Sequence, residues 1–207
     1  MVGLAAVILW AALWFPDRTA AQSEITRFEA LTKAVVAPAG DPDFQLWSPG
    51  RIQAWRQAVS TSAPPPLGIL RVSRLRVEAA VLEGTDESTL NRAVGHITGT
   101  AQPGTAGNVG IAGHRDSFFR ALKDVAIGDT IDLATPAGPV VYRVEQTWIV
   151  TPDDVWVLAP TPVPALTLVT CYPFYFVGSA PQRFIVRAVR STPLRTKTRA
   201  DQGRFPE

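Results

Sequence analysis

The sequence contains a small set of residues that could carry out nucleophilic acyl transfer. It has one cysteine, Cys171, and two histidines, His96 and His114. A thiol is mostly protonated at neutral pH, so it needs a nearby base or cation before it can attack a carbonyl carbon. A histidine can act as that base and can later protonate a leaving amine. These residue types predict cysteine-dependent acyl transfer, although a single cysteine is often only a small buried apolar residue.

Cys171 and His114 both stand at the end of an apolar run. Residues 165–170 lead into Cys171, and residues 109–113 lead into His114, with a polar or proline-containing turn after each. A strand end gives a side chain a rigid support with one open side. His96 lies instead between a short predicted helix and a loop rich in glycine and proline, where we expect structural hydrogen bonds.

Arg183 is the third candidate. It follows Cys171 by twelve residues across a turn-rich segment and opens another apolar run, so antiparallel pairing would place the two side by side. A fixed guanidinium there could hold the negative oxygen of a tetrahedral intermediate, which typically contributes about 3–4 kcal/mol. One alternative is that Arg183 is only a solvent-exposed arginine at a strand edge. The other is that Arg187, on the same strand, is the arginine that takes this role.

The elements that must position these residues are mostly predicted β-strands. Apolar and polar residues alternate with period two in several short segments, separated by clusters of Gly, Pro and Asp. The predicted strands cover residues 75–81, 108–112, 130–133, 140–144, 148–150, 166–171 and 184–189. With one brief helix near residues 88–93, this pattern indicates a barrel or a sandwich.

Helices are expected before this β-rich part. Residues 23–36 have apolar positions at helical spacing, and a second helix should begin at Ser48, which can cap it, with Pro49 in the first turn. The two helices could form a stalk or a lid, or could pack against the outside of the domain. Residues 60–66, STSAPPP, favour an extended linker because consecutive prolines cannot join a sheet interior.

Residues 1–15 are uncharged and apolar. A helix of about 15 residues rises only about 22 Å, against about 30 Å of membrane hydrocarbon. Three interpretations remain open: a membrane anchor, a cleaved secretory signal and a buried core helix. We favour the anchor because no positive charge precedes the apolar stretch and because Trp10 and Trp14 suit a membrane interface.

Composition excludes several classes of function. The net charge is only +2 and the basic residues are scattered, which argues against nucleic acid as a partner. One cysteine excludes an internal disulfide, and one cysteine with two histidines makes no structural zinc set. The acidic pair Asp153 and Asp154 suits a turn better than a calcium site. We expect no cofactor and no metal.

The motifs around the three candidates resemble those of the sortase family. Residues 167–171, TLVTC, resemble the sortase TLxTC signature, and residues 183–188, RFIVRA, resemble the arginine-bearing strand that follows it. Residues 107–119, GNVGIAGHRDSFF, resemble the segment with the sortase histidine, and residues 95–104 resemble its lead-in. The segments HRDSFF and CYPF look most similar to class D.

The resemblance, which runs from about residue 67 to 189, implies a closed eight-stranded β-barrel. It also implies Cys171 as nucleophile, His114 as acid/base and Arg183 as oxyanion stabiliser, with Thr170 positioning the substrate or completing the oxyanion site. Sortases cleave an LPxTG-like motif near the C-terminus of a secreted protein, form a thioester and pass the acyl group to an amine of a cell-wall precursor or a protein subunit.

Two other interpretations stay open. An L,D-transpeptidase-like enzyme would act on peptidoglycan, but its Ser-His-Gly-Cys motif is absent before Cys171. A membrane-tethered β-domain without activity would only bind a partner. A papain-like hydrolase fits less well, because it places its cysteine before its histidine.

The predicted organisation has four parts. Residues 1–18 form a single-pass membrane anchor, 19–66 a helical stalk with a proline-rich linker, 67–190 the catalytic barrel outside the cytoplasm, and 191–207 a disordered basic tail.

Overall fold

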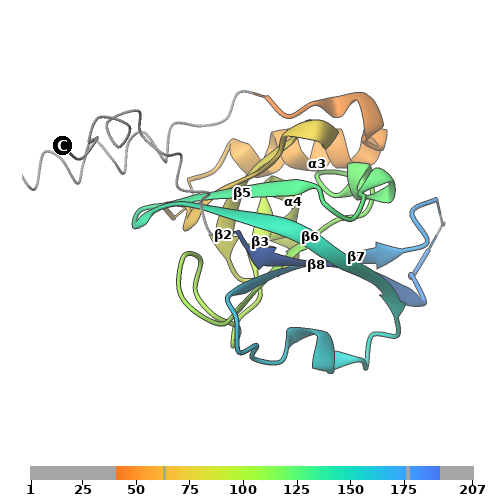
Figure 1. Ribbon diagram of the computed structural model, residues 1–207. Helices are drawn as coiled ribbons and strands as arrows, with labels where there is room; N and C mark the ends of the chain where they lie inside the picture. The colour runs from red at the N-terminus through yellow and green to blue at the C-terminus, as the bar shows by residue number, and fades with distance from the viewer. Residues whose placement is uncertain (1–40, 63, 176–177, 192–207) are drawn as a thin grey trace, which may run out of the picture. The chain divides into compact units, whose positions relative to one another are not determined.

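The computed structural model describes residues 41–62, 64–175 and 178–191 (Figure 1). These residues belong to one unit of the chain, Ala39–Glu207. The predicted anchor, the helix expected at 23–36 and nearly all of the basic tail lie outside the described residues, so the four-part division stays a prediction. No helix in the described part of the chain has the length and apolarity needed to cross a membrane.

The described residues form a closed barrel of eight strands in the order β1-β2-β3-β4-β7-β8-β6-β5 (Figure 1). Two neighbouring pairs in it, β2 with β3 and β4 with β7, are parallel. The strands are β1 (Gly68–Val72), β2 (Val77–Glu83), β3 (Val94–His96), β4 (Asn108–Gly113), β5 (Thr130–Thr135), β6 (Gly138–Val150), β7 (Ala165–Tyr172) and β8 (Gln182–Arg190). The predicted closed barrel is confirmed, and the sandwich is excluded.

The core of the barrel follows from the alternation in its strands. In β5 and the first half of β6 every second residue is buried, as expected where one face meets the core. Strand β4 is buried at five of its six positions and β7 at five of its first six, which suits parallel neighbours covered on both faces. The largest fully buried side chains include Tyr142, Phe119, Leu70, Ile111 and Leu168.

Two strands were not predicted, and one began too early. β1 and β3 are five and three residues long, too short for a clear alternation. The strand expected from Leu75 begins at Val77, because residues 73–75 form the 3₁₀ helix η2 (Ser73–Leu75). Arg76 follows it in the left-handed region, with φ of 54°, and this turns the chain before the alternation can start.

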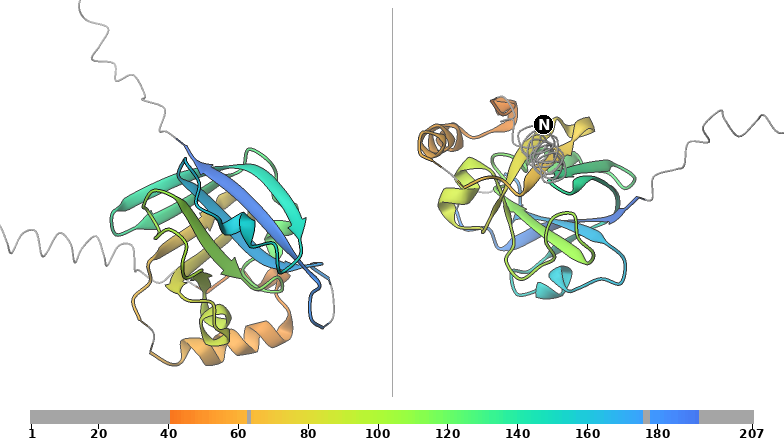
Figure 2. Two further views of the ribbon diagram at one scale, coloured as in Figure 1. Left: turned by 90° about the horizontal axis from the view of Figure 1, so that it is seen from below. Right: turned by 90° about the vertical axis from the view of Figure 1, so that its left-hand side faces the viewer.

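The helix predicted to begin at Ser48 is present as α3 (Pro49–Val59). The Ser48 hydroxyl accepts a hydrogen bond from the amide of Arg51, and proline occupies the first turn. α3 lies alongside α4 (Glu87–Arg92) on the outside of the barrel (Figure 2). For α3, packing against the domain is therefore confirmed.

An aromatic cluster attaches the segment before α3 to the barrel. The 3₁₀ helix η1 (Phe44–Leu46) precedes α3. The ring of Trp47 lies 4.6 Å, centroid to centroid, from that of Phe118 and 5.2 Å from that of Phe44, and Phe44 also meets Trp55 at 5.3 Å. Phe118 lies only four residues after His114, so this cluster docks the segment beside a candidate residue.

Three hydrogen bonds hold Asn108 at the start of β4. Its Nδ2 donates to the carbonyls of Val157 and Ala159 at 3.1 and 3.0 Å, and its Oδ1 accepts from the Thr167 hydroxyl at 2.7 Å. Asn108 is 2% exposed, so its amide depends on these partners. The bonds tie β4 to β7 and to the 3₁₀ helix η4 (Val155–Leu158).

We expect Asn108→Ala to lower the free energy of unfolding by about 1–3 kcal/mol, because two carbonyls and a hydroxyl lose their buried partner. Chemical denaturation of the full chain measures the change. Gln57→Ala, at an exposed position of α3, is the control and should change stability little. Equal stability of the two variants would show that water replaces the Asn108 amide without cost.

Candidate active site

The end of the parallel pair β4 and β7 brings two candidates to one rim of the barrel. Gly113 pairs with Thr170 at the end of this ladder, and the Thr170 hydroxyl donates to the Gly113 carbonyl at 2.8 Å. His114 and Cys171 each follow this pair directly. Because parallel strands end on the same side of a sheet, the two side chains start from adjacent strand ends.

Arg183 joins them from the next strand. In the antiparallel pair β7 and β8, Cys171 stands directly opposite Arg183, so both side chains leave the same face of the sheet. Arg183 is partly buried, and its Nη1 donates to the carbonyls of Ala180 and Gln182 at 3.2 and 3.0 Å. Arg183 thus stands opposite the cysteine in the register, as predicted, and its guanidinium is held by carbonyls of its own turn.

Arg187 is clearly separated from this rim. It pairs with Thr167 in the middle of β7, and its Nε donates to the Thr167 hydroxyl at 2.9 Å. Four residues of strand correspond to about 13 Å, so Arg187 cannot replace Arg183 beside Cys171.

Thr170 and His96 are both buried and hydrogen-bonded within the protein. Thr170 is 2% exposed, and successive strand residues alternate between faces, so its side chain lies on the opposite face from Cys171. Its role in positioning substrate stays a prediction. His96 is fully buried, with Nδ1 3.0 Å from Glu83 Oε2 and Nε2 3.0 Å from the Ala101 carbonyl oxygen. The predicted structural hydrogen bonding of His96 is confirmed.

The glycine before His114 allows a close approach of Phe119. A Cβ at Gly113 would lie 2.7 Å from the Phe119 ring, and Phe119 is fully buried. A side chain at position 113 would therefore displace either the ring or the end of β4. The Phe119 ring thus explains why a glycine precedes His114.

The environment of His114 favours a neutral imidazole. Its side chain is 14% exposed, and Nε2 is buried with no hydrogen-bond partner in the described part of the chain. Burial lowers the pKa of His114 below its usual value, and the positive charge of Arg51 acts in the same direction. Glu87 and Asp116 oppose this shift of the His114 pKa but do not reverse it. A neutral imidazole can accept a proton from a thiol.

Cys171 is a free, partly exposed cysteine. A sealed core thiol could not meet a substrate, so this exposure satisfies the first requirement for a nucleophile. The described residues contain no group of three or more His, Cys, Asp or Glu side chains placed to hold a metal ion. The side chains at the rim offer a nucleophile, a base and a cation.

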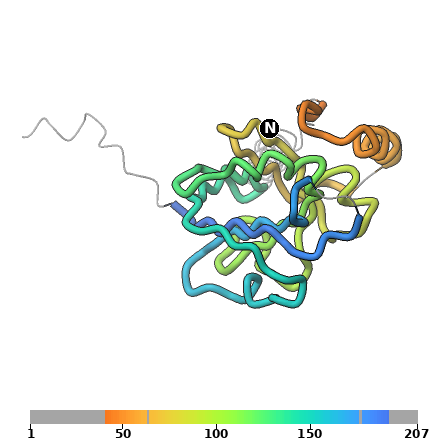
Figure 3. Tube along the Cα trace, turned by 90° about the vertical axis from the view of Figure 1, so that its right-hand side faces the viewer, coloured from red at the N-terminus to blue at the C-terminus, as the bar shows by residue number. Residues whose placement is uncertain are grey.

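Two arginines that the sequence did not single out hold the loop between β7 and β8. Arg115 donates to the carbonyls of Pro173 and Gly178 at 3.2 and 2.8 Å. Arg120 donates to the carbonyl of Phe174, and its guanidinium carbon lies 4.3 Å from the centre of the Tyr175 ring. The Cα trace in Figure 3 shows this blue segment beside the green segment that follows His114.

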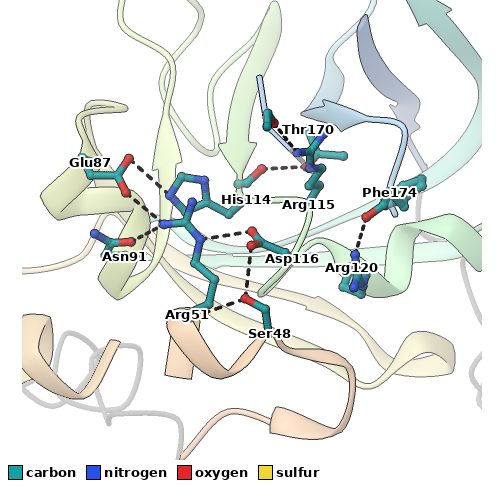
Figure 4. A network of polar contacts seen from close by, with 12 residues as sticks. Ser48, Arg51, Glu87, Asn91, His114, Arg115, Asp116, Arg120, Thr170 and Phe174 are labelled. Atoms are coloured by element: carbon teal, nitrogen blue, oxygen red, sulfur yellow. Dashed lines mark hydrogen bonds and ion pairs between the residues drawn. The ribbon is translucent and has the colours of Figure 1, made fainter. Parts of the chain in front are cut away.

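Arg51 and Glu87 also approach His114 and were not predicted (Figure 4). Glu87 Oε2 lies 3.6 Å from His114 Nε2, and Arg51 Nη1 donates to the other oxygen of Glu87 at 2.9 Å. Glu87 and His114 are 27 positions apart in the sequence, a separation that gives no periodic relation from which this contact could be predicted. Asp116, two residues after His114, could only have been suspected from its proximity.

Comparison with known proteins gives a consistent result. Residues 70–191 match the family model for the sortase domain. Sortase D of Bacillus subtilis is 36% identical over 126 residues, which are 60% of this chain and 64% of that protein, so the chain spans less than two thirds of this curated relative.

Solved structures share the fold. Sortase A from Corynebacterium diphtheriae has a TM-score of 0.59 at 27% identity, covering 84% of this chain and 86% of that chain. The pilus-related sortase C of Group B Streptococcus has a TM-score of 0.60 at 25% identity, covering 83% and 91%. The sortase D5 transpeptidase of Clostridium perfringens, at 24% identity, has a TM-score of 0.57, covers 72% and 91%, and supports the fold alone.

Proposed function

Because this chain belongs to the sortase family, we propose that it is a cysteine transpeptidase that cleaves an LPxTG-like sorting motif of secreted proteins and joins the acyl part to an amine. The observation that carries the proposal is the register that brings His114, Cys171 and Arg183 to the ends of three neighbouring strands. The 36% identity to a sortase D supports assignment to class D.

In the acylation half of the proposed reaction, His114 takes the proton of the Cys171 thiol as the sulfur attacks the carbonyl carbon of the motif threonine. The carbonyl oxygen becomes negative, and the Arg183 guanidinium stabilises it. The intermediate collapses to a thioester when the C–N bond breaks, and the imidazolium gives its proton to the departing amine.

In the transfer half, an acceptor amine attacks the thioester carbon and loses a proton to His114. Arg183 stabilises the second oxyanion, and the thiolate leaves and is reprotonated by the imidazolium. The products are a new amide bond and the free thiol, so the sum is transpeptidation. The acceptor belongs to a cell-wall precursor or a protein subunit in this proposal.

The test uses an LPxTG-containing peptide and triglycine as the acceptor amine, with the full chain in mild detergent. Mass spectrometry should show cleavage after threonine and a product that carries triglycine. A peptidoglycan stem peptide tests the L,D-transpeptidase alternative in parallel. Turnover of the stem peptide alone, or of neither substrate, would contradict the proposal.

We also propose that residues 1–18 hold the enzyme in the cell membrane with the barrel outside the cytoplasm. The support is the uncharged apolar composition of residues 1–15 and a substrate class that is secreted. Protease added to intact cells should digest the barrel, whereas a barrel protected until lysis would contradict this orientation.

Thr170 acts in this proposal by holding β7 to β4 beside the reacting groups. We expect Thr170→Val, which keeps the shape but removes the bond to the Gly113 carbonyl, to lower kcat roughly three- to tenfold and stability by about 1 kcal/mol. Peptide cleavage and thermal unfolding measure both. Thr170→Ser keeps a hydroxyl and should retain most activity; a Val variant as active as wild type would remove Thr170 from the site.

A further inference from the structure

A polar network joins the helix before the barrel to both sides of His114 (Figure 4). Arg51 on α3 donates from Nη1 to Glu87 Oε1 at 2.9 Å and to Asn91 Oδ1 at 2.6 Å. Its Nε donates to Asp116 Oδ1 at 3.1 Å. One guanidinium therefore binds two carboxylates, one before and one after His114 in the chain.

The network is anchored at its base. The Ser48 hydroxyl donates to Asp116 Oδ2 at 3.2 Å, and the Ser48 amide donates to the Asp116 carbonyl at 3.1 Å. The Arg51 side chain is only 24% exposed, and Trp47, which directly precedes Ser48, packs against Phe118. α3 is thus fixed to the residues that directly follow His114.

Within this network, Glu87 has one oxygen for Arg51 and the other for His114. Its Oε2 lies 3.6 Å from Nε2, which is within ion-pair range but too long for a hydrogen bond. The hydrogen bond from Arg51 lowers the pKa of Glu87, so the carboxylate is charged when an imidazolium forms beside it. His114 Nε2 has no hydrogen-bond partner in the described residues, so Glu87 is the group paired with it here.

We propose that Arg51 and Glu87 are positioning residues for His114, so that α3, which precedes the segment matched by the family model, completes the active site. The inference rests on the proposed function. Glu87 orients the ring and supports the imidazolium that forms during acylation. Arg51 holds Glu87 and Asp116 in place. Its positive charge also offsets their effect on the pKa of His114, so that the resting imidazole stays neutral.

The charges that face His114 come from several elements. Arg51 comes from α3, Glu87 from α4, and Asp116 from the turn after β4, while Cys171 and Arg183 stand on the adjacent strands β7 and β8. Removing the positive charge of Arg51 should raise the pKa of His114, and removing the negative charge of Glu87 should lower it further. The two substitutions are therefore expected to act in opposite directions.

Histidine-selective ¹³Cε1 NMR on the full chain, in a Cys171→Ala background, measures this pKa without a coupled thiol titration. The chain has two histidines, and buried His96, with its own hydrogen bonds, is an internal reference. Arg51→Gln should raise the His114 midpoint by about half a pH unit or more, and Glu87→Gln should lower it by a similar amount. Arg71→Gln, which breaks the exposed pair with Glu78, is the matched control.

Kinetics of the single variants then separate positioning from charge. Arg51→Gln and Glu87→Gln should lower kcat roughly five- to thirtyfold with little change in KM, because a misplaced base affects the chemical step. Arg51→Lys should restore the His114 midpoint but only part of kcat, since an ammonium cannot bind both carboxylates as a fork does. Thermal unfolding identifies any variant that fails to fold. If Arg51→Gln fails, Glu87→Gln carries the test of the His114 midpoint and Arg51→Lys carries the test of kcat.

A His114 midpoint that is the same in the Arg51, Glu87 and Arg71 variants would overturn the inference, as would an unchanged kcat in both glutamine variants. Wild-type turnover of the LPxTG peptide is measured in the same series. Its absence would refute the proposed function, whereas normal wild-type turnover with unshifted midpoints would refute only the positioning role.

Discussion

Replacing Cys171 with alanine is expected to abolish cleavage and transfer, lowering kcat by at least about 10⁴-fold. No other thiol exists in the chain, so no second nucleophile of this type can substitute. The measurement is the rate of peptide cleavage, together with intact mass after incubation with substrate but without acceptor. Wild type should gain the mass of the acyl part of the peptide, and the alanine variant should gain nothing.

A chemical control avoids any effect of the substitution on folding. Under mild conditions iodoacetamide reacts preferentially with thiols, and Cys171, which is partly exposed, is the one thiol in the sequence. Alkylation should remove activity in step with the added mass, and the LPxTG peptide should slow it. Cleavage that persists in the alanine variant or in fully alkylated enzyme would exclude Cys171 as the nucleophile.

Substituting Arg183 by lysine is expected to lower kcat by about 10²- to 10³-fold, the loss typical of a missing oxyanion donor. The guanidinium stands opposite Cys171 and is already held by the carbonyls of Ala180 and Gln182. Lysine keeps the charge but has neither the planar fork nor its fixed direction. Single-turnover formation of the thioester measures the effect on the chemical step.

Arg187→Lys is the matched control on the same strand. It disturbs the bonds of the guanidinium to the Thr167 hydroxyl and the Val157 carbonyl, and should reduce stability while leaving most of the activity. An Arg183→Lys enzyme with full activity would remove Arg183 from the site. Loss of activity in the Arg187 variant alone would likewise contradict the role proposed for Arg183.

The sequence predicted the fold and the three candidates from local signals. Cys171 and His114 could be placed at strand ends because each follows an apolar run and precedes a turn. Arg183 could be placed beside Cys171 because a short turn-rich segment favours an antiparallel pair. The family resemblance added the closed barrel, since alternation alone does not distinguish a barrel from a sandwich.

The surroundings of His114 could not be predicted in this way. Arg51 and Glu87 reach it from two short helices whose packing depends on distant aromatic contacts such as that between Trp47 and Phe118. Strand β3 spans only three residues, too few to show a period. Long-range packing and very short elements leave no local pattern, so the charges that set the pKa of His114 needed the structure.

The hold of Arg115 and Arg120 on the β7/β8 loop has a consequence for protein engineering. Both arginines bind main-chain carbonyls, of Pro173, Gly178 and Phe174, and every amino acid has such a carbonyl. These main-chain bonds do not depend on the side chains of the loop, although Arg120 also contacts the Tyr175 ring. Randomised libraries that keep Tyr175 and the buried Phe174 should preserve the anchored main chain while altering the surface of the loop, which makes it a practical place to select enzymes with new peptide preferences.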